Sequence, residues 1–320
     1  MSGLFAIYRK ELGDYFSSYR FVILFALIAM VSFVTSYMAG ISLRESVEQN
    51  PKSGQFLFLM LFSTAGARFS MIQFVAFFGP LMGLFLGFDA INRERAQGTL
   101  VKVVSQPIYR DSVINGKFLA GATVITVMIV AIVLVIGGFG MALLGVVPAV
   151  EEILRLALYV LISIFYISFW LAVSILFSIL FKSTATSALA SVAAWILLSF
   201  VLSFGASAVA NAVAPIDNKE EADVEMVMKN VQITEAISVF SPMVLYMNST
   251  ATIVDPSLNT TKSLVLRGPW EQILSARFQN PLSLGQSLSV VIPFVVALVA
   301  ITLIFFAISY TVFMVQEIRT

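Results

Sequence analysis

Six long runs of apolar residues without a single Asp, Glu, Lys or Arg limit what this chain can fold into. A helix needs about 20 apolar residues to cross the roughly 30 Å hydrocarbon core of a bilayer. Every run reaches that length, so each one predicts a transmembrane helix. The fold class is therefore predicted to be an all-α membrane protein with six spans. The runs cover residues 21–43, 69–88, 118–147, 156–181, 186–214 and 287–315.

The composition supports this fold class and removes most enzyme classes. Hydrophobic residues make up 59% of the chain and charged residues 12%, whereas about a quarter of the residues of a soluble domain are charged. The sequence contains no Cys and no His, which excludes thiol chemistry, His-dependent triads and the usual zinc sites. No metal site and no catalytic residue is predicted, and the chain is not expected to be an enzyme. The net charge of +1 gives no reason to expect nucleic acid.

The distribution of Lys and Arg between the predicted loops orients the spans. Cytoplasmic loops carry an excess of these residues. With the N-terminus inside, the short outer loops hold four of them, which are Arg44, Lys52, Arg68 and Arg155. The cytoplasmic parts then hold ten, which are Arg9, Lys10, Arg20, Arg93, Arg95, Lys102, Arg110, Lys117, Lys182 and Arg319. Both termini are therefore predicted to be cytoplasmic. The alternative that the first run is a signal peptide is weaker, because signal cores have only about 7–15 apolar residues.

Residues 1–20 are predicted to form an interfacial helix on the cytoplasmic membrane surface. At 100° per residue, the large apolar side chains fall within an arc of about 120°, and the charged ones lie outside it. The alternative is a soluble tail with a chance periodicity, but the aromatic stripe leads directly into the first span. The apolar stripe is Leu4, Phe5, Tyr8, Leu12, Tyr15, Phe16 and Tyr19. The charged residues outside it include Arg9, Lys10 and Glu11.

The remaining chain divides at the ends of the apolar runs. Residues 21–214 hold spans one to five, and residues 287–320 hold the last span and a cytoplasmic tail. Residues 215–286 are predicted to form an external subdomain that starts with an acidic stretch. Asn248 and Asn259 each begin an Asn-x-Ser/Thr motif. They are possible glycosylation acceptors, because the orientation places them outside.

Small and hydroxyl side chains recur at four-residue spacings within two of the spans. Gly79, Gly83 and Gly87 of the second span allow two helix backbones to approach closely. That contact would be with a helix of the same chain or with a second copy. The fifth span carries a weakly polar strip that would either line a translocation path or pack between helices. This strip includes Ser191, Ser199 and Ser203.

The six runs hold no ionisable residue, which bears on the energy source. Ion-coupled carriers generally keep such groups at membrane depth, so a secondary transporter or channel without an ATPase partner is the weaker alternative. The chain also lacks a phosphate-binding loop. Around Gly116-Lys117, Asp111 stands where the motif needs Gly and Phe118 where it needs Ser or Thr. Energy for transport would therefore come from a separate ATPase subunit.

An intramembrane enzyme is a further alternative. Its catalytic residues would have to lie at the membrane face. The acids that the topology brings near each other on the inner face are Asp89, Glu94 and Asp111. Without His, Cys or a metal constellation they make a poor catalytic site.

The predicted cytoplasmic loop 89–117 carries an ordered set of motifs that resembles a known family. The motifs are Glu94-Arg95, Gly98-Thr99-Leu100, an apolar stretch, Ser105-Gln106-Pro107, Arg110 and Gly116-Lys117. In this order they resemble the first cytoplasmic loop of the integral permeases of type-2 ABC (ATP-binding-cassette) exporters. Arg9-Lys10-Glu11-Leu12 is similar to the basic-Glu-Leu motif of that family's leading helix. Six spans with both termini inside also agree, so the resemblance covers the whole chain.

The resemblance implies a transporter driven by partner subunits. Two ATPase subunits, which bind ATP and Mg, would join two permeases, either two copies of this chain or one with a close relative. The chain itself would bind no cofactor, and its location would be the plasma membrane of a prokaryote. Loop 89–117 would pass the ATPase motion to the spans. The residues assigned to this coupling are Asp89, Asn92, Arg93, Glu94, Arg95, Gly98, Thr99, Leu100, Ser105, Gln106, Pro107, Arg110 and Lys117.

The charges of this loop also have a physical interpretation of their own. A short helix ending near Gly98 would carry Arg93, Glu94 and Arg95 on a polar side, where they can form charge-assisted contacts with a soluble partner. The alternative is that they are topological anchors and solvated surface. The long external segment departs from the family, which often has shorter re-entrant helices there. Relatives of this build export lipids, peptides, drugs or ions, or transmit force to external proteins.

Overall fold

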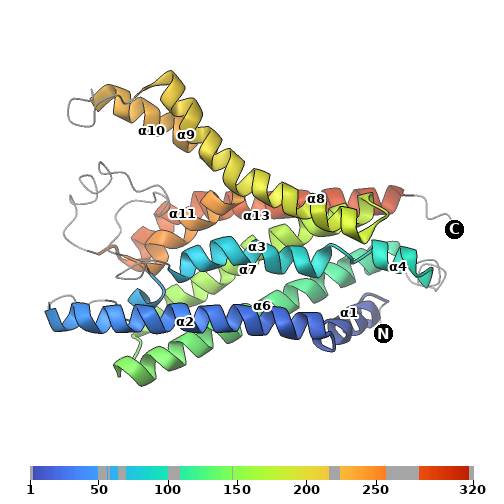
Figure 1. The fold of residues 1–320 in the computed structure, drawn as a ribbon, viewed down its shortest axis with the longest axis horizontal. Coiled ribbons are helices and arrows are strands. Elements are labelled where there is room, and N and C mark those ends of the chain that lie inside the picture. The colour runs from blue at the N-terminus through green and yellow to red at the C-terminus, as the bar shows by residue number, and fades with distance from the viewer. Residues whose placement is uncertain are drawn as a thin grey trace.

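The protein is a bundle of helices (Figure 1). The computed structural model describes residues 3–49, 56, 58–63, 70–99, 109–145, 147–215, 224–256 and 281–316. Within these ranges the regular structure is helical and contains no strand, which confirms the predicted all-α class. The elements are α1 (Gly3–Phe16), α2 (Tyr19–Gln49), η1 (Leu59–Leu61), α3 (Met71–Gly87), α4 (Asn92–Ala96), α6 (Arg110–Leu144), α7 (Val150–Leu180), α8 (Thr184–Ile196), the π-helical η2 (Leu197–Val201), α9 (Leu202–Val213), α10 (Val224–Ser238), α11 (Pro242–Val254) and α13 (Leu284–Val315).

Six stretches of helix are long and apolar enough to cross a membrane: α2, α3, α6, α7, the continuous α8–α9 helix and α13. They correspond to the six predicted spans, which are confirmed. The helices α10 and α11 together make a seventh candidate, but they bend by 111° relative to each other. Two boundaries differ from the prediction because helices continue beyond the charge-free runs. Lys117 lies inside α6, and Arg155, predicted in an outer loop, lies inside α7.

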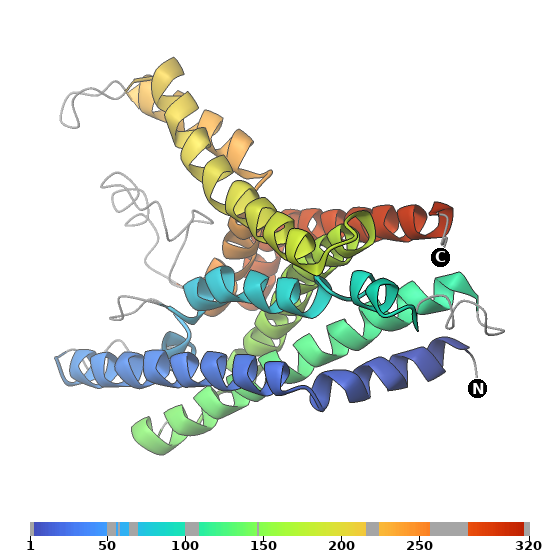
Figure 2. The ribbon, with the colours of Figure 1, turned by 45° about the vertical axis from the view of Figure 1, so that its right-hand side comes forward.

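The central helix of the bundle is α7, which packs against α3, α6, α11 and α13 (Figure 2). Its span is 72% buried, against 22% for α2 and 17% each for the α8–α9 helix and α13. The outer helices expose large apolar side chains, for example Leu189 and Phe204 at 73% and 67%. Such faces suit the hydrocarbon of a bilayer, in which apolar side chains need no protein partner.

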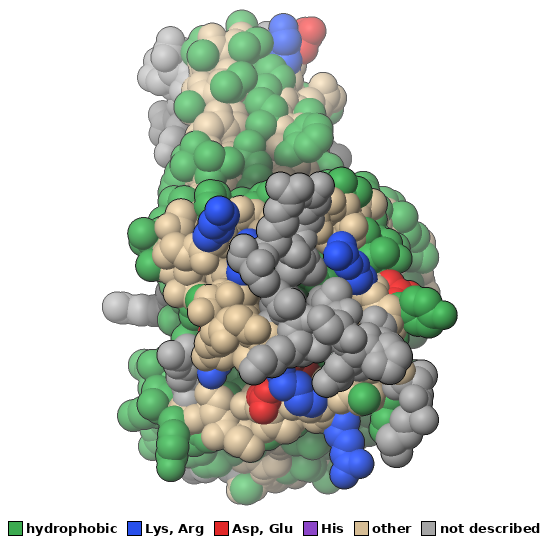
Figure 3. All heavy atoms as spheres, turned by 90° about the vertical axis from the view of Figure 1, so that its right-hand side faces the viewer, with side chains coloured by type: hydrophobic (Ala, Val, Ile, Leu, Met, Phe, Trp, Pro, Cys, Tyr) green, Lys and Arg blue, Asp and Glu red, His purple; other side chains and the backbone are tan. Residues whose placement is uncertain are grey.

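Both described ends of the chain lie at the same end of the bundle as α4 (Figures 1 and 2). We call this the proximal end and the opposite one the distal end. Figure 3 looks onto the proximal end, where Lys and Arg side chains are spread over the face. The helix α1 packs along α6 there, and a Cβ on Gly116 would come within 2.8 Å of Ile7 Cγ2.

The predicted N-terminal helix is present as α1, but protein covers part of it. Ile7 and Glu11 are its buried residues, although Glu11 was predicted on the solvated side. This assignment was wrong because α6 supplies a cation for the carboxylate. Phe5 and Phe16 of the apolar stripe stay exposed and remain available to the membrane surface.

The three glycines of the second span form the contact between α3 and α7. A Cβ on Gly83 would lie 2.5 Å from Ile167 O and 2.9 Å from Leu171 N. A Cβ on Gly79 would lie 3.0 Å from Ile167 Cγ1, and one on Gly87 would meet the Ser174 hydroxyl. Of the two predicted uses, packing within the chain is therefore the one that the described structure displays.

The fifth span passes from α8 through the π-helical turn η2 into α9. Ser191 is buried and its hydroxyl donates to Ser187 O at 2.8 Å. Ser203 is half-buried and donates to Ser199 O, also at 2.8 Å. Ser199 itself is buried within the π-turn. These positions and bonds match the packing interpretation of the serine strip.

The segment before the last span differs from the predicted external subdomain. After α10, which pairs with α9 in an arm that stands away from the bundle (Figure 2), the chain enters α11. Nearly all of α11 is buried, because it packs against α3, α7 and α13. Asn248 lies in this helix with its Oδ1 buried, so the folded chain offers no room for a glycan there, and the predicted glycosylation of Asn248 is wrong. Asn259 and the acidic start of the segment lie outside the described residues.

Candidate functional site

The short helix α4 is held in place by the neighbouring chain. Its first amide groups lack partners within the helix, and those of Ile91 and Asn92 donate to the Ser178 hydroxyl of α7 at 2.9 and 3.2 Å. Asn92 is fully buried and its Nδ2 donates to Phe88 O at 3.2 Å. At the other end, Gly98 adopts a left-handed φ of 67°, which favours glycine. These features place a helix where the loop sequence predicts one.

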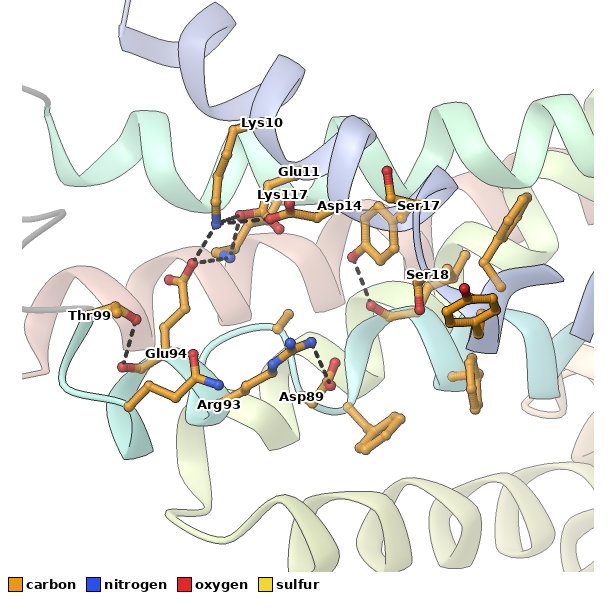
Figure 4. A pocket seen from close by; sticks show the side chains of 18 residues that line it. Lys10, Glu11, Asp14, Ser17, Ser18, Asp89, Arg93, Glu94, Thr99 and Lys117 are labelled. Atoms are coloured by element: carbon orange, nitrogen blue, oxygen red, sulfur yellow. Dashed lines mark hydrogen bonds and ion pairs between the residues drawn. The ribbon is translucent and has the colours of Figure 1, made fainter. Parts of the chain in front are cut away.

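A buried ammonium group joins α4 to α1 and α6. Lys117 Nζ lies 2.9 Å from Glu11 Oε1 and 3.0 Å from Glu94 Oε1 (Figure 4). The Lys117 side chain is only 3% exposed. Lys10 adds a second cation, 2.9 Å from Glu11 Oε1 and 3.1 Å from Glu94 Oε1. Two carboxylates and two ammonium groups thus neutralise one another, as charges removed from water require.

The charges of this cluster shift one another's proton affinities. Burial by itself raises the pKa of the Glu11 carboxyl, but the Lys117 and Lys10 ammonium groups outweigh burial and lower it. Burial opposes the charged form of Lys10, yet Glu11 and Glu94 raise the pKa of Lys10 above its usual value. Burial and the nearby carboxylates raise the pKa of Tyr15. Its hydroxyl donates to Leu86 O at 2.8 Å, which fastens α1 to α3.

Arg95 joins α4 to the end of α13. Its Nη2 donates to Gln316 Oε1 at 2.7 Å, and its Nη1 donates to Ile179 O of α7 at 3.4 Å. Gln316 also accepts a bond at its carbonyl oxygen from Arg110 Nη1 at 3.3 Å. The amide of Gln316 returns to Ile179 O at 3.3 Å. The cluster therefore reaches four helices, α1, α6, α7 and α13, from the five residues of α4.

The three charges predicted to face a soluble partner do not share one environment. Arg93 points outward with 61% of its side chain exposed, and its Nη1 lies 3.9 Å from Asp89 Oδ2. Glu94 and Arg95 turn back to the bundle and bond to other helices. The expectation of one solvated face is corrected, because the proximal ends of α6 and α13 supply partners. Leu100, Lys102, Ser105, Gln106 and Pro107 lie outside the described residues.

The remaining predicted residues fall around the same site. Thr99 Oγ1 donates to Glu94 O at 3.2 Å, behind Gly98. Arg9 is exposed on α1. A cavity of about 730 Å³ opens between α1, the start of α2, the end of α3 and α4 (Figure 4). Among the described residues, no three Asp or Glu side chains are grouped so that they could hold a metal ion.

A second buried charge cluster, which the sequence alone did not indicate, lies at the distal end. The Arg155 side chain is completely buried, and its Nη2 and Nε bond to Glu151 Oε1 at 2.8 and 3.1 Å. Its Nη1 donates to Thr252 O and Ile253 O, both at 3.3 Å. These carbonyls belong to the last turn of α11, which has no intrahelical donors for them. Further bonds reach the start of α13 at Leu282 O (2.8 Å) and Ser287 Oγ (3.1 Å).

Glu152 extends this distal cluster to η1. Its Oε1 accepts from the amides of Phe58 and Leu59 at 3.1 and 3.4 Å, and its Oε2 accepts from Ala149 N at 2.8 Å. One carboxylate thus serves the N-terminal amides of two helices, η1 and α7. The only sequence signal was the pair Glu151-Glu152 four and three residues before Arg155, a spacing that favours ion pairs on one helix face.

Comparison with known proteins agrees with this arrangement of spans and loops. The profile of the family described as ABC-2 family transporter protein matches residues 5–318. A relative from Pseudomonas aeruginosa, named "Probable ABC transporter permease protein NosY", is 26% identical over 159 residues, which are 50% of this chain and 52% of the relative. The protein of the same name from Stutzerimonas stutzeri is 26% identical over 153 residues, 48% of this chain and 49% of the relative.

The chain spans about half the length of the curated relatives it matches. The family match, in contrast, runs from α1 to the residues that follow α13. It therefore includes all six spans and both charge clusters. The chain belongs to the ABC-2 family of transporter proteins.

Proposed function

We propose that this chain receives the movement of a separate ATPase subunit at α4 and passes it to the transmembrane helices, which drives export. The family match and the permease relatives support a membrane permease subunit of an ABC transporter. In such a transporter, ATP and Mg bind to the ATPase, and two ATPases work with two permeases. The absence of a phosphate-binding loop in the sequence agrees with this division of labour.

The observation that carries the proposal is the set of bonds around α4. Glu94 bonds to Lys10 of α1 and Lys117 of α6, and Arg95 bonds to Gln316 after α13. A displacement of α4 therefore acts on these helices together. Arg93 faces outward from the same turn, where it can meet a carboxylate of the ATPase.

The proximal end is then the cytoplasmic end, because ATP and the ATPase are cytoplasmic. The excess of Lys and Arg in the connections at that end agrees with this orientation. Both termini would be cytoplasmic, and the host membrane would be the plasma membrane of a prokaryote, as the bacterial relatives suggest. The distal cluster around Arg155 would hold the outer ends of α7, α11 and α13 together.

An ion-coupled carrier or channel is the second candidate, and the positions of the buried charges argue against it. Lys117, Glu11 and Glu94 lie at the proximal end, and Arg155 and Glu152 lie at the distal end. An ion relay needs titratable groups between the two ends. In the described residues of the six spans, the middle of the bundle instead holds hydroxyl and aromatic side chains.

Copurification with the cognate ATPase tests the proposal. Arg93→Glu should raise the dissociation constant about 30-fold or more, since a broken interfacial charge pair costs about 2–5 kcal/mol. Lys182→Glu is a matched control, because Lys182 is exposed near the proximal end of α7 but lies outside α4. ATP hydrolysis of the complex should fall only in the α4 variant. Equal ATPase binding by the parent chain and Arg93→Glu would contradict docking at α4.

A further inference from the structure

The cavity at the proximal end lies where the apolar spans meet the charged cluster. Its volume of about 730 Å³ falls within the roughly 300–1,000 Å³ of small-molecule sites. It is bounded by α1, the turn between α1 and α2, the last turn of α3 and α4. Neither α1 nor α4 is a membrane span, so the cavity lies at the edge of the spanning region.

One wall of the cavity is apolar and belongs to the spans. Phe21 comes from the first turn of α2, and Phe85 and Phe88 come from the end of α3. Tyr15 and Leu86 complete this wall. Because α2 is the outer span with a largely exposed apolar surface, the wall continues onto a face that lipid chains would cover.

The facing walls carry charges of both signs. Figure 4 shows Lys10, Glu11 and Asp14 of α1 on one side, with Arg93 and Asp89 across from them. Arg93 and Asp14 are the accessible members, with 61% and 64% of their side chains exposed. Ser17 and Ser18 add hydroxyl groups at the turn between α1 and α2.

Two features favour a ligand that brings both a cation and an anion. Acids outnumber bases in the lining by four to three, counting Glu11, Asp14, Asp89 and Glu94 against Lys10, Arg93 and Lys117. Glu94 in addition has a buried oxygen, Oε2, without a hydrogen-bond partner among the described residues. An unmatched buried acceptor is costly, and an approaching ammonium group would satisfy it.

We propose that this cavity binds the headgroup of a zwitterionic phospholipid that carries a primary ammonium. The phosphate lies at Arg93 and the hydroxyl groups of Ser17 and Ser18. The ammonium lies between Asp14 and Glu94, and an acyl chain follows the apolar wall from Phe21. Charge-assisted bonds at both ends of the headgroup fix its orientation. A purely anionic headgroup would meet the excess of carboxylates, and a trimethylated one could not donate hydrogen bonds to them.

Such a lipid would connect α1 and α4, the elements that the Lys117 cluster already joins. The membrane composition would then affect how firmly α4 is held. The binding site itself needs no ATPase, so it can be tested on the permease alone, and its failure would leave the proposed coupling untouched.

Native mass spectrometry of the purified, delipidated full-length chain tests the proposal. The probes are phosphatidylethanolamine, phosphatidylcholine and phosphatidylglycerol with identical acyl chains, added singly. We expect phosphatidylethanolamine to bind about tenfold more tightly than the other two, as expected when charged hydrogen bonds are lost. Asp14→Asn and Arg93→Gln should remove this preference. Arg9→Gln, an exposed charge of α1 that does not line the cavity, should keep it.

The substituted side chains are largely exposed, so folding is not at risk, and the unfolding temperature of each variant verifies this. Equal binding of the three lipids, or an unchanged preference in both cavity variants, would overturn the proposal. A second measurement uses Ser18→Cys in this chain without cysteines. Its maleimide labelling should slow when phosphatidylethanolamine is added. Protection only by the ATPase would show that the cavity receives a protein segment instead, which also overturns the lipid assignment.

Discussion

Lys117 of α6 and Glu94 of α4 lie 3.0 Å apart, Nζ to Oε1, although 23 residues separate them in the chain. Glu11 of α1 approaches the same ammonium to 2.9 Å. One buried cation thus fixes the mutual position of three helices at the proximal end. Its removal affects the attachment of α4 more than any exposed charge of the loop can.

Lys117→Met should destabilise the protein by about 3–5 kcal/mol, because it leaves two partly buried carboxylates without their shared cation. The measurement is thermal unfolding of the purified chain in detergent. The double variant Glu11→Gln/Lys117→Met removes one stranded carboxylate and should recover part of the loss. A Lys117→Met protein as stable as its parent would show that Lys10 alone neutralises both carboxylates.

Acid should loosen the attachment of α1. The pKa of Glu11 is lowered from its usual 4.5 in the folded protein, so its charged form stabilises the fold above that pH. This stabilisation is lost as the pH falls through the lowered pKa. We expect the unfolding temperature of the parent to drop below pH 4.5 more steeply than that of Glu11→Gln. Parallel profiles of the two proteins would exclude this role of Glu11.

Gly83→Ala should destabilise the contact between α3 and α7. The added Cβ would lie 2.5 Å from Ile167 O and 2.9 Å from Leu171 N, and backbone atoms of a central helix cannot move aside easily. Overpacking of this kind costs about 1–3 kcal/mol. Gly138→Ala in α6 is the matched control, because no atom lies within 4 Å of its Cβ position. Comparison of the two unfolding temperatures is the measurement, and a Gly83→Ala protein no less stable than Gly138→Ala would contradict the close approach.

Gly98→Val should disturb the end of α4 without changing a charge. Its φ of 67° costs a non-glycine residue about 1–2 kcal/mol, whereas Asn tolerates this conformation better. Hydrogen exchange of the α4 amides should therefore accelerate in Gly98→Val and change little in Gly98→Asn. If α4 transmits motion, ATPase binding should survive while transport per ATP hydrolysed falls. Unchanged exchange in both variants would contradict the role of Gly98 as the end of the helix.

Arg155→Lys should behave as a severe substitution despite its retained charge. The guanidinium donates in several directions, to Glu151, to the end of α11 and to the start of α13, and an ammonium cannot match this geometry. Each carbonyl left unsatisfied costs about 1–3 kcal/mol. Hydrogen exchange of α11 should accelerate most. Exposed Lys182→Ala serves as the control, and similar exchange in the two variants would count against a structural role of Arg155.

The parts of the fold that follow from local pattern could be predicted from the sequence. The six charge-free runs identify the spans because hydrocarbon length sets the length of a helix. The α1 periodicity and the Gly98 that ends α4 are local signals of the same kind. The motifs of the loop also led to the correct family, since their order depends on the sequence alone.

The charge clusters could not be predicted, because their partners come from distant parts of the chain. Arg155 looks like a loop residue by its charge, and only the carbonyls of Thr252 and Ile253, 97 and 98 residues away, make its burial possible. Glu11 looked solvated for the same reason, as its cation belongs to α6. The burial of α11 likewise depends on the groove that α3, α7 and α13 leave.

The π-helical turn Leu197–Val201 sets the direction of the arm formed by α9 and α10. The buried residues Ser187, Ser191, Trp195 and Ser199 stand four apart. On an ideal helix such positions would rotate by about 40° per step, and the wider turn winds part of this rotation back. Deletion of a single residue from the turn would restore ordinary α-helix and rotate α9 by about 100° around the axis of the span. The azimuth of the whole arm therefore depends on one inserted residue.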